Sequence, residues 1–265
     1  LGALILVSDA AGNTVMRTLE LRVPYTPADA TVDFTEFAPC PEAAVGTVWY
    51  LTDTRAGGNN NTYKVKKLQD NRIWMVQDLK FGTCPNSTAS WNNDNSEAAT
   101  TAGTTVYTGY VGHCRSSSQA NAGYLYNWPA AMQSTKAYKG SSDNSFQCTG
   151  TSGSACQGIC PSGWHIPTGN TAGEFNILHS VSGRNCSTSN DDCWDSGSTF
   201  EGVIGGYCSD GGSLYGQGSY ADYWSSTYSS NGDAYFQYFD SAYTGRGTDS
   251  NSKGNGRSVR CVRNY

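Results

Sequence analysis

The residues of this sequence with the most reactive side chains are ten cysteines and three histidines. Clustered thiolates would bind zinc, but only Cys156 and Cys160 come near the spacing that metal ligands need. A cytosol would keep ten scattered thiols reduced, so their even number favours disulfide bonds formed in an oxidising compartment. We therefore expect a secreted extracellular protein that holds no metal and no cofactor.

Catalytic groups at a recognisable spacing are absent from the sequence. Because all ten cysteines can pair, no thiol is left as a nucleophile, and no glycine-rich phosphate-binding motif occurs. The acids Asp94, Asp191 and Asp192 lie in polar loops, where carboxylates more often bind water or form turns than catalyse reactions. We therefore expect no enzyme activity. The three histidines are His113, His165 and His179.

The composition is typical of a loop-rich extracellular domain. Charged residues make up 15% of the chain, while Gly (31) and Tyr (17) are frequent. The net charge is −5 and Lys and Arg form no block, which argues against nucleic acid and anionic membranes as partners. No stretch approaches the length of a membrane span. The sequence begins without a methionine, so we expect Leu1 to follow a cleavage site.

Residues 1–23 have the pattern of a β-hairpin. Residues 1–7 are a continuous apolar run, short enough for a strand that is apolar on both faces. A turn cluster follows at residues 9–13, and residues 18–23 alternate between polar and apolar as in a half-buried strand. A lone hairpin is marginal in water and a bare apolar strand promotes aggregation, so another surface must cover it. The residues expected in that interface are Leu1, Leu4, Ile5, Leu6, Val7, Leu19, Leu21 and Val23.

Three interpretations of the hairpin remain open at this stage. A linker at residues 24–44, semi-extended by its prolines, could carry the hairpin to a neighbouring copy, where it would complete a sheet by strand addition. Such a head-to-tail contact does not close and builds a filament. Alternatively, residues 1–23 are the last two strands of an upstream immunoglobulin-like domain, because the turn "DAAGNT" resembles turns that end many bacterial immunoglobulin-like repeats. In the third interpretation the hairpin folds back on its own chain.

From Cys40 onward the sequence predicts mostly strands and loops, with two short helices. One helix is expected over residues 127–132, with Pro129 near its first turn. The second is expected over residues 171–180, where Phe175 and Leu178 share a face. The predicted strands span residues 47–52, 63–68, 72–79, 223–227, 234–239 and 258–263.

Five phrases appear in a fixed order: "YKVKKLQDNRIWMVQDLKFG", "NAGYLYNWPAAM", "CPSGWHIP", "YWSST" and "GRSVRCVRN". Together they resemble the Fibrobacter succinogenes major paralogous domain family, a secreted bacterial domain of surface proteins, over residues 45–265. The resemblance implies an α+β, C-type-lectin-like fold that is loop-rich and stapled by disulfides. The N-terminal hairpin would precede this domain. The same fold occurs in formylglycine-generating enzymes, but a shared fold does not carry their activity with it.

The resemblance also implies two disulfides. One joins Cys84 to Cys114, ahead of the "GYLY" phrase, and the other joins Cys160 to Cys261, in two of the family phrases. The remaining cysteines would form two local pairs across short polar loops and one leftover pair, although spacing alone does not fix connectivity. These three pairs are Cys148–Cys156, Cys186–Cys193 and Cys40–Cys208.

Short glycosylation patterns occur in the polar loops. Asn60, Asn86 and Asn185 each lie in the N-glycosylation pattern. Ser241 lies in an Asp-Ser-Ala pattern that resembles O-glycosylation sites of Bacteroidetes-like secreted proteins. These four residues are candidate modification sites of a surface glycoprotein.

The leading hypothesis is a structural subunit of an extracellular, pilus-like bacterial filament, a homopolymer joined by N-terminal strand donation. The alternative is a surface adhesin module that binds glycans, with residues 1–23 left from an immunoglobulin-like domain. Exposed tyrosines would supply its sugar-stacking faces. These tyrosines are Tyr107, Tyr110, Tyr215, Tyr220, Tyr228 and Tyr243.

Overall fold

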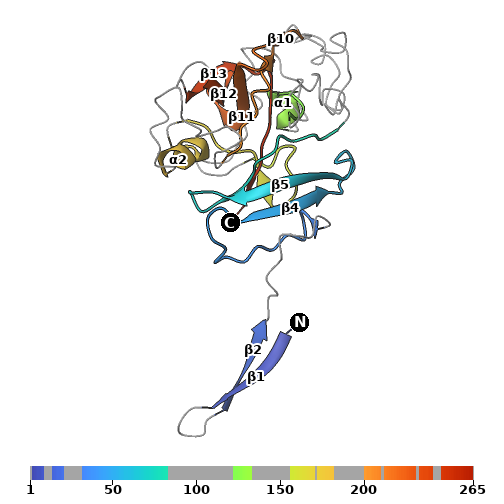
Figure 1. Cartoon of the computed structure of the whole chain (residues 1–265), viewed down its shortest axis with the longest axis vertical. Helices are drawn as coiled ribbons and strands as arrows, with labels where there is room; N and C mark the ends of the chain where they lie inside the picture. The colour runs from blue at the N-terminus through green and yellow to red at the C-terminus, as the bar shows by residue number, and fades with distance from the viewer. Residues whose placement is uncertain are drawn as a thin grey trace.

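The computed structural model describes residues 2–8, 14–20, 32–82, 122–132, 156–170, 172–181, 200–209, 212–230, 233–240 and 246–264. Over these ranges strands dominate and are arranged in four sheets (Figure 1). The expected α+β class is therefore wrong, and the fold is β-rich. Both predicted helices exist, but they have only four and eight residues, too short to form a layer of their own.

The N-terminal strands form a sheet by themselves. β1 (Gly2–Ser8) pairs antiparallel with β2 (Thr14–Glu20), in a register that places Ile5 opposite Arg17 and Leu6 opposite Met16. In the described part of the chain neither strand joins another sheet, and in Figure 1 the hairpin lies apart from the other strands. The predicted hairpin is thus confirmed as a local element.

The largest sheet has six strands and brings the beginning and the end of the domain together. β3 runs parallel to β4, and the other neighbours are antiparallel. In β4 the side chains of Trp49 and Leu51 are buried while Tyr50 is exposed, as the two-residue period of a strand requires. In spatial order the strands are β3 (Val32–Asp33), β4 (Val48–Asp53), β5 (Asn61–Lys67), β6 (Ile73–Met75), β15 (Val262–Arg263) and β8 (Trp164–His165).

Two smaller sheets lie beyond the large one. The first is a meander of three long antiparallel strands, with a bulge in its first strand between Trp224 and Tyr228. Its strands are β11 (Tyr220–Tyr228), β12 (Asp233–Asp240) and β13 (Arg246–Ser252). The second is built from four two-residue strands. In spatial order they are β10 (Leu214–Tyr215), β9 (Tyr207–Cys208), β14 (Gly256–Arg257) and β7 (Tyr126–Asn127).

The two helices begin and pack as their sequences suggest. α1 (Trp128–Ala131) starts at Asn127, whose side-chain oxygen accepts a hydrogen bond from the backbone N–H of Ala130 at 3.0 Å. α2 (Glu174–Val181) buries Phe175 and Leu178, the two residues predicted to share a face. Neither helix is long and apolar enough to cross a membrane, a statement that covers the described ranges only.

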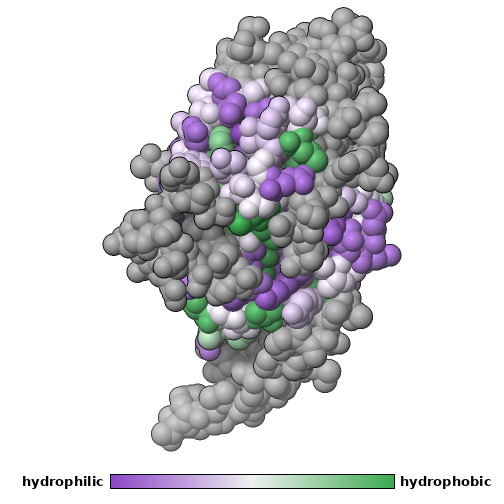
Figure 2. Space-filling view, turned by 45° about the horizontal axis from the view of Figure 1, so that its top comes forward, coloured by the Kyte–Doolittle hydropathy of each residue, from purple (hydrophilic) through white to green (hydrophobic). Residues whose placement is uncertain are grey.

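Among the described residues, five tryptophans anchor the core. The indole of Trp128 donates to the carbonyl of Ser225 at 2.8 Å, and that of Trp224 donates to the carbonyl of Tyr126 at 2.7 Å. These bonds let large rings be buried without an unpaired N–H. On the face seen in Figure 2, the described surface is mostly hydrophilic with small hydrophobic patches. The buried tryptophans are Trp49, Trp74, Trp128, Trp164 and Trp224.

Candidate functional site

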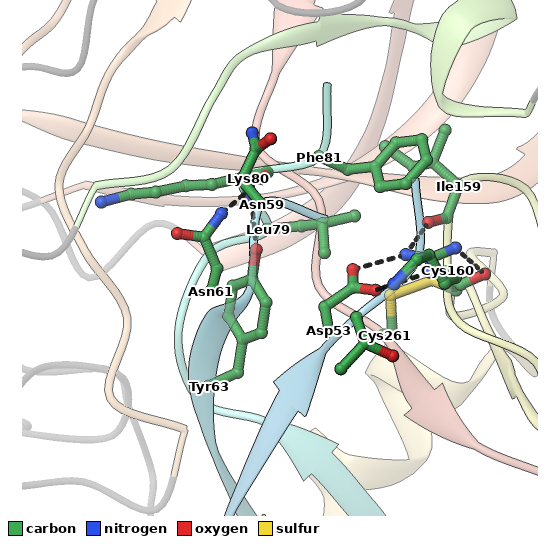
Figure 3. A network of polar contacts seen from close by, with 12 residues as sticks. Asp53, Asn59, Asn61, Tyr63, Leu79, Lys80, Phe81, Ile159, Cys160 and Cys261 are labelled. Atoms are coloured by element: carbon green, nitrogen blue, oxygen red, sulfur yellow. Dashed lines mark hydrogen bonds and ion pairs between the residues drawn. A yellow bond between two sulfur atoms is a disulfide. The ribbon is translucent and has the colours of Figure 1, made fainter. Parts of the chain in front are cut away.

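A disulfide joins the segment before β8 to the segment before β15. Cys160 and Cys261 are both buried, and their sulfurs lie 2.06 Å apart, as the family resemblance implied. Beside this bond, the guanidinium of Arg55 donates to the carbonyls of Cys160 at 2.9 Å and Ile159 at 3.0 Å (Figure 3). The disulfide therefore lies in a polar corner of the domain, where Arg55 fixes the turn between β4 and β5.

That corner is built by the turn between β4 and β5. The buried carboxylate of Asp53 accepts two bonds from Arg55, each 2.8 Å long, which is the strong bidentate geometry of this pair. The Tyr63 hydroxyl accepts the backbone N–H of Lys80 at 2.9 Å, and burial raises the pKa of this phenol. The predicted glycosylation residue Asn60 is exposed on the same turn. Because these polar groups bind the protein's own backbone, the corner is structural.

The other cysteines divide into three groups. Cys156 is also disulfide-bonded, and its predicted partner Cys148 lies outside the described residues. Cys40 and Cys208 are free thiols, so the predicted bond between them is wrong. Cys208 is buried between Leu125 and Leu214, whereas Cys40 is exposed where the domain begins. The bond was predicted only because these two cysteines were left over after the other pairs, and the fold puts them in different environments. Also outside the described residues are Cys84, Cys114, Cys186 and Cys193.

His165 is held between two side-chain acceptors. Its Nε2 lies 2.9 Å from both carboxylate oxygens of Glu174, and its Nδ1 faces the amide oxygen of Asn264. Burial acts to raise the pKa of Glu174, but the hydrogen bond and charge of His165, with help from Thr168 and Arg72, lower it below its usual value. Both ring nitrogens are engaged, so His165 stabilises the fold. His179 lies in α2, and His113, Asp94, Asp191 and Asp192 lie outside the described residues.

A second buried ion pair, between Arg257 and Asp222, packs against the three-stranded sheet. The guanidinium of Arg257 stacks on the ring of Phe236 with a centroid distance of 3.8 Å and on Trp224 at 4.5 Å. Its Nε lies 3.3 Å from the carboxylate of Asp222. Burial raises the pKa of Asp222 to about 6, against the opposing charge of Arg257, and burial lowers the pKa of Arg257. This pair therefore carries a desolvation cost that the stacked rings help to offset.

Beside this pair lies a group of tyrosines that we call the tyrosine platform: Tyr207, Tyr215 and Tyr220. The rings of Tyr207 and Tyr215 stack with centroids 5.6 Å apart and planes at 23°. Tyr215 is 50% exposed and Tyr220 is 41% exposed. Of the tyrosines predicted to be exposed, Tyr228 is half-buried, while Tyr107, Tyr110 and Tyr243 lie outside the described residues.

The remaining predicted sites fall partly within the described chain. Leu4, Ile5, Leu6 and Val7 lie in β1 and Leu19 lies in β2, all in the separate hairpin sheet. Among the described residues no group of three His, Cys, Asp or Glu side chains is arranged to hold a metal ion. The other predicted residues, which lie outside the described ranges, are Leu1, Leu21, Val23, Asn86, Asn185 and Ser241.

These features define a β-rich, disulfide-containing domain whose buried polar groups hold its own loops together. The sequence pattern of the Fibrobacter succinogenes major domain matches residues 48–263, so the chain belongs to this family and the resemblance is confirmed. No curated relative and no solved structure matches the chain. The C-type-lectin-like fold that the resemblance implied therefore has no support from a solved structure.

Sequence reasoning missed the two buried arginines. Arg257 and Arg260 lie in the family phrase "GRSVRCVRN", but their acidic partners Asp222 and Asp78 are far away in the chain. The sequence did contain one indication that these arginines are buried, because small and apolar residues flank both of them. The glycines that separate the exposed tyrosines in "GSLYGQGSY" were the available signal for the platform.

Proposed function

We propose that this protein is a structural subunit of an extracellular bacterial filament that polymerises head to tail by donating its N-terminal hairpin to a neighbouring copy. The observation that carries the proposal is the sheet formed by β1 and β2 alone. A two-stranded sheet is at best marginally stable in water, and β1 reads Gly-Ala-Leu-Ile-Leu-Val-Ser. Burial of these apolar residues against a second copy would stabilise both the hairpin and the assembly.

The extracellular location is supported by the bonded cysteines. Both Cys160–Cys261 and the disulfide of Cys156 would be reduced in most cytosols. Membership of the Fibrobacter succinogenes major domain family over most of the chain is compatible with this location.

The edge of the three-stranded sheet is the favoured acceptor. β13 has seven residues, as β1 does, and in the described part of the chain it pairs with β12 only. A free edge of this length presents backbone donors and acceptors to an incoming strand. Next to it, Thr248 of β13 contacts Asn176 of α2, and the same helix exposes Ile177 and Val181. An added strand would therefore gain both main-chain hydrogen bonds and an apolar contact.

Deletion of residues 1–7 tests the donor. The full chain should form long polymers visible by negative-stain electron microscopy, while the deletion variant should stay monomeric in analytical ultracentrifugation. Polymers that form equally well without residues 1–7 would refute the proposal. A chain that is monomeric with or without them would favour the alternative, an adhesin module with a remnant hairpin.

A matched pair of substitutions tests the acceptor. Val181→Glu places a charge on the exposed surface of α2, the helix that contacts β13 through Asn176. Val45→Glu places a charge at a residue of nearly equal exposure, 46% against 45%, that is far from this edge in the chain. We expect Val181→Glu to slow or abolish polymerisation and Val45→Glu to leave it unchanged. Equal effects of the two variants would exclude the β13 edge while leaving strand donation itself to the deletion experiment.

A further inference from the structure

The tyrosine platform has the composition and rigidity of a ligand-binding surface, which nothing in the assembly of a filament requires. Tyr215 at the end of β10 and Tyr220 at the start of β11 are the two exposed rings. Tyrosine offers a large, rigid, amphipathic contact at low entropic cost. These two exposed rings lie within six consecutive residues, whereas single exposed apolar side chains scattered over a surface need no explanation.

Glycines hold the two exposed tyrosines in place. Gly216 has a φ of +64°, and a Cβ there would lie 2.0 Å from Cδ2 of Tyr220, so the ring packs directly over the glycine. Gly206 has a φ of +71°, and a Cβ there would lie 2.3 Å from the carbonyl oxygen of Tyr215. Only glycine fits this backbone path at both positions.

Backbone hydrogen bonds fix the same segment. Tyr220 donates its N–H to Gly216 at 2.8 Å, Gly206 donates to the carbonyl of Tyr220 at 2.8 Å, and Gly218 donates to Ile204 at 3.0 Å. A surface that is ordered before binding does not lose further entropy when a ligand arrives. The platform is therefore organised in advance.

Stacked side chains on the interior side also support the platform. Tyr207 stacks on one face of Tyr215, and the Cζ atom of Arg257 lies 5.6 Å from the centroid of Tyr207. Arg257 is itself buried and fixed by its stacking on Phe236. This column of stacked groups defines the orientation of Tyr215, which remains 50% exposed.

The chemistry around the two rings identifies the class of ligand. Residues 212–220 read Gly-Ser-Leu-Tyr-Gly-Gln-Gly-Ser-Tyr and contain no charged side chain. The exposed polar groups between the rings are the amide of Gln217 and the hydroxyl of Ser219. Uncharged donors and acceptors beside aromatic faces suit a ligand that has C–H faces and hydroxyl groups. A nucleic acid would instead need cations for its phosphates, which this segment does not supply.

We propose that the tyrosine platform binds a neutral saccharide, with pyranose rings stacked on Tyr215 and Tyr220 and hydroxyl groups bonded to Gln217 and Ser219. The inference goes beyond filament assembly and does not depend on it. Two stacking faces and two polar groups without a deep cavity give weak binding, with a Kd of about 0.1–1 mM.

Titration calorimetry of the protein with maltohexaose, mannohexaose and chitohexaose tests the inference. At least one hexasaccharide should bind, and Tyr215→Ala and Tyr220→Ala should each weaken it by roughly tenfold, as expected for the loss of one aromatic anchor. Tyr215→Phe should change the affinity by less than about twofold, since stacking is kept. The control is Tyr50→Ala, because Tyr50 has the same 41% exposure as Tyr220 but lies on β4.

Three results would overturn the inference. The first is that none of the three hexasaccharides binds at about 10 mM, ten times the upper Kd of about 1 mM. The second is that Tyr50→Ala loses as much affinity as Tyr215→Ala and Tyr220→Ala. The third is that an acidic heparin hexasaccharide binds more tightly than any neutral one. Gly216→Ala gives an independent check, since its Cβ would displace the ring of Tyr220 without removing an aromatic group. Affinity that is unchanged in this variant would also contradict a preorganised platform.

Discussion

Arg260 and Asp78 form an ion pair in which both side chains are completely shielded from solvent, with Nε and Oδ1 2.8 Å apart. The two residues are 182 positions apart in the sequence. Arg260 also donates to the backbone carbonyls of Phe200 and Glu201, and Ser258 donates to Asp78 at 3.2 Å. The pair thus links the segment after β6, the segment before β9 and the C-terminal segment through one buried network.

Breaking this pair from one side should be strongly destabilising. Asp78→Ala leaves a buried guanidinium without its counter-charge, which costs about 3–5 kcal/mol of unfolding free energy. The double variant Asp78→Leu/Arg260→Met removes both charges and should lose less than Asp78→Ala alone. Urea unfolding followed by tryptophan fluorescence measures both.

The matched control is the partly exposed ion pair between Lys64 and Glu201, whose atoms approach to 2.6 Å. Solvent screens this pair, so Lys64→Ala should lower the unfolding free energy by about 0–1 kcal/mol. If Asp78→Ala costs no more than Lys64→Ala, the buried network does not stabilise the fold as the geometry indicates.

The Cys160–Cys261 disulfide should make a large contribution to stability, because it closes a loop of 101 residues. The loop-entropy argument gives about 4–5 kcal/mol for a loop of this length, and measured removals usually cost about 2–5 kcal/mol. The double variant Cys160→Ala/Cys261→Ala should therefore unfold at much lower urea concentration. Cys40→Ser, at an exposed free thiol, is the control and should shift the midpoint little. Equal midpoints for the two variants would contradict the prediction.

Thiol labelling separates the two free cysteines. Cys40 is exposed and should react with iodoacetamide in the folded protein, whereas Cys208 is buried and should react only after unfolding. Peptide mass mapping without reductant reads out both positions. A peptide pair linked through Cys40 and Cys208 would contradict the structure and restore the bond that the sequence predicted.

Local patterns predicted local structure well, because the forces that set them act over a few residues. The shared face of Phe175 and Leu178 predicted α2, and the strand predicted over residues 47–52 corresponds to β4. The predicted strand over residues 258–263 is wrong as one element. Within it only residues 262–263 form a strand, β15. β14 ends at Arg257, and Arg260 between the two strands lies in the buried network.

Long-range relationships could not be predicted from one sequence. The Cys40–Cys208 pair came from elimination, but a disulfide needs two thiols brought side by side by the fold, and Cys208 lies in a buried cluster. The α+β class came with the family resemblance, and the helices prove too short to support it. Of the three candidate tyrosines that the structure describes, Tyr215 and Tyr220 are exposed, since glycine-built turns place them outward, and Tyr228 is half-buried.

Acid should remove the stabilisation that Glu174 provides. Its pKa is lower in the folded protein than its ordinary value of 4.5, because His165, Thr168 and Arg72 favour the carboxylate. A carboxyl with a depressed folded pKa stabilises the fold above its unfolded pKa, and this contribution is lost as the pH falls through the folded value. Glu174→Gln should therefore be less stable than the parent at pH 7, with a difference that shrinks below about pH 4.5. Urea midpoints between pH 3 and pH 7 measure the difference, and one that stays constant with pH would contradict this assignment.

Two glycines in the loop before β8 should respond differently to the same substitution. Both Gly158 and Gly163 have a positive φ, +54° and +79°, so alanine carries a backbone cost of about 1–2 kcal/mol at each. A Cβ at Gly158 would also lie 2.3 Å from the carbonyl oxygen of Ala131 and 2.7 Å from Cδ1 of Ile166, whereas nothing lies within 4 Å of one at Gly163. Gly158→Ala should therefore lower the unfolding free energy by about 1–3 kcal/mol more than Gly163→Ala, the cost of overpacking a well-filled site. Thermal unfolding of the two variants measures this difference directly, and equal melting temperatures would show that the loop relaxes away from α1 without cost.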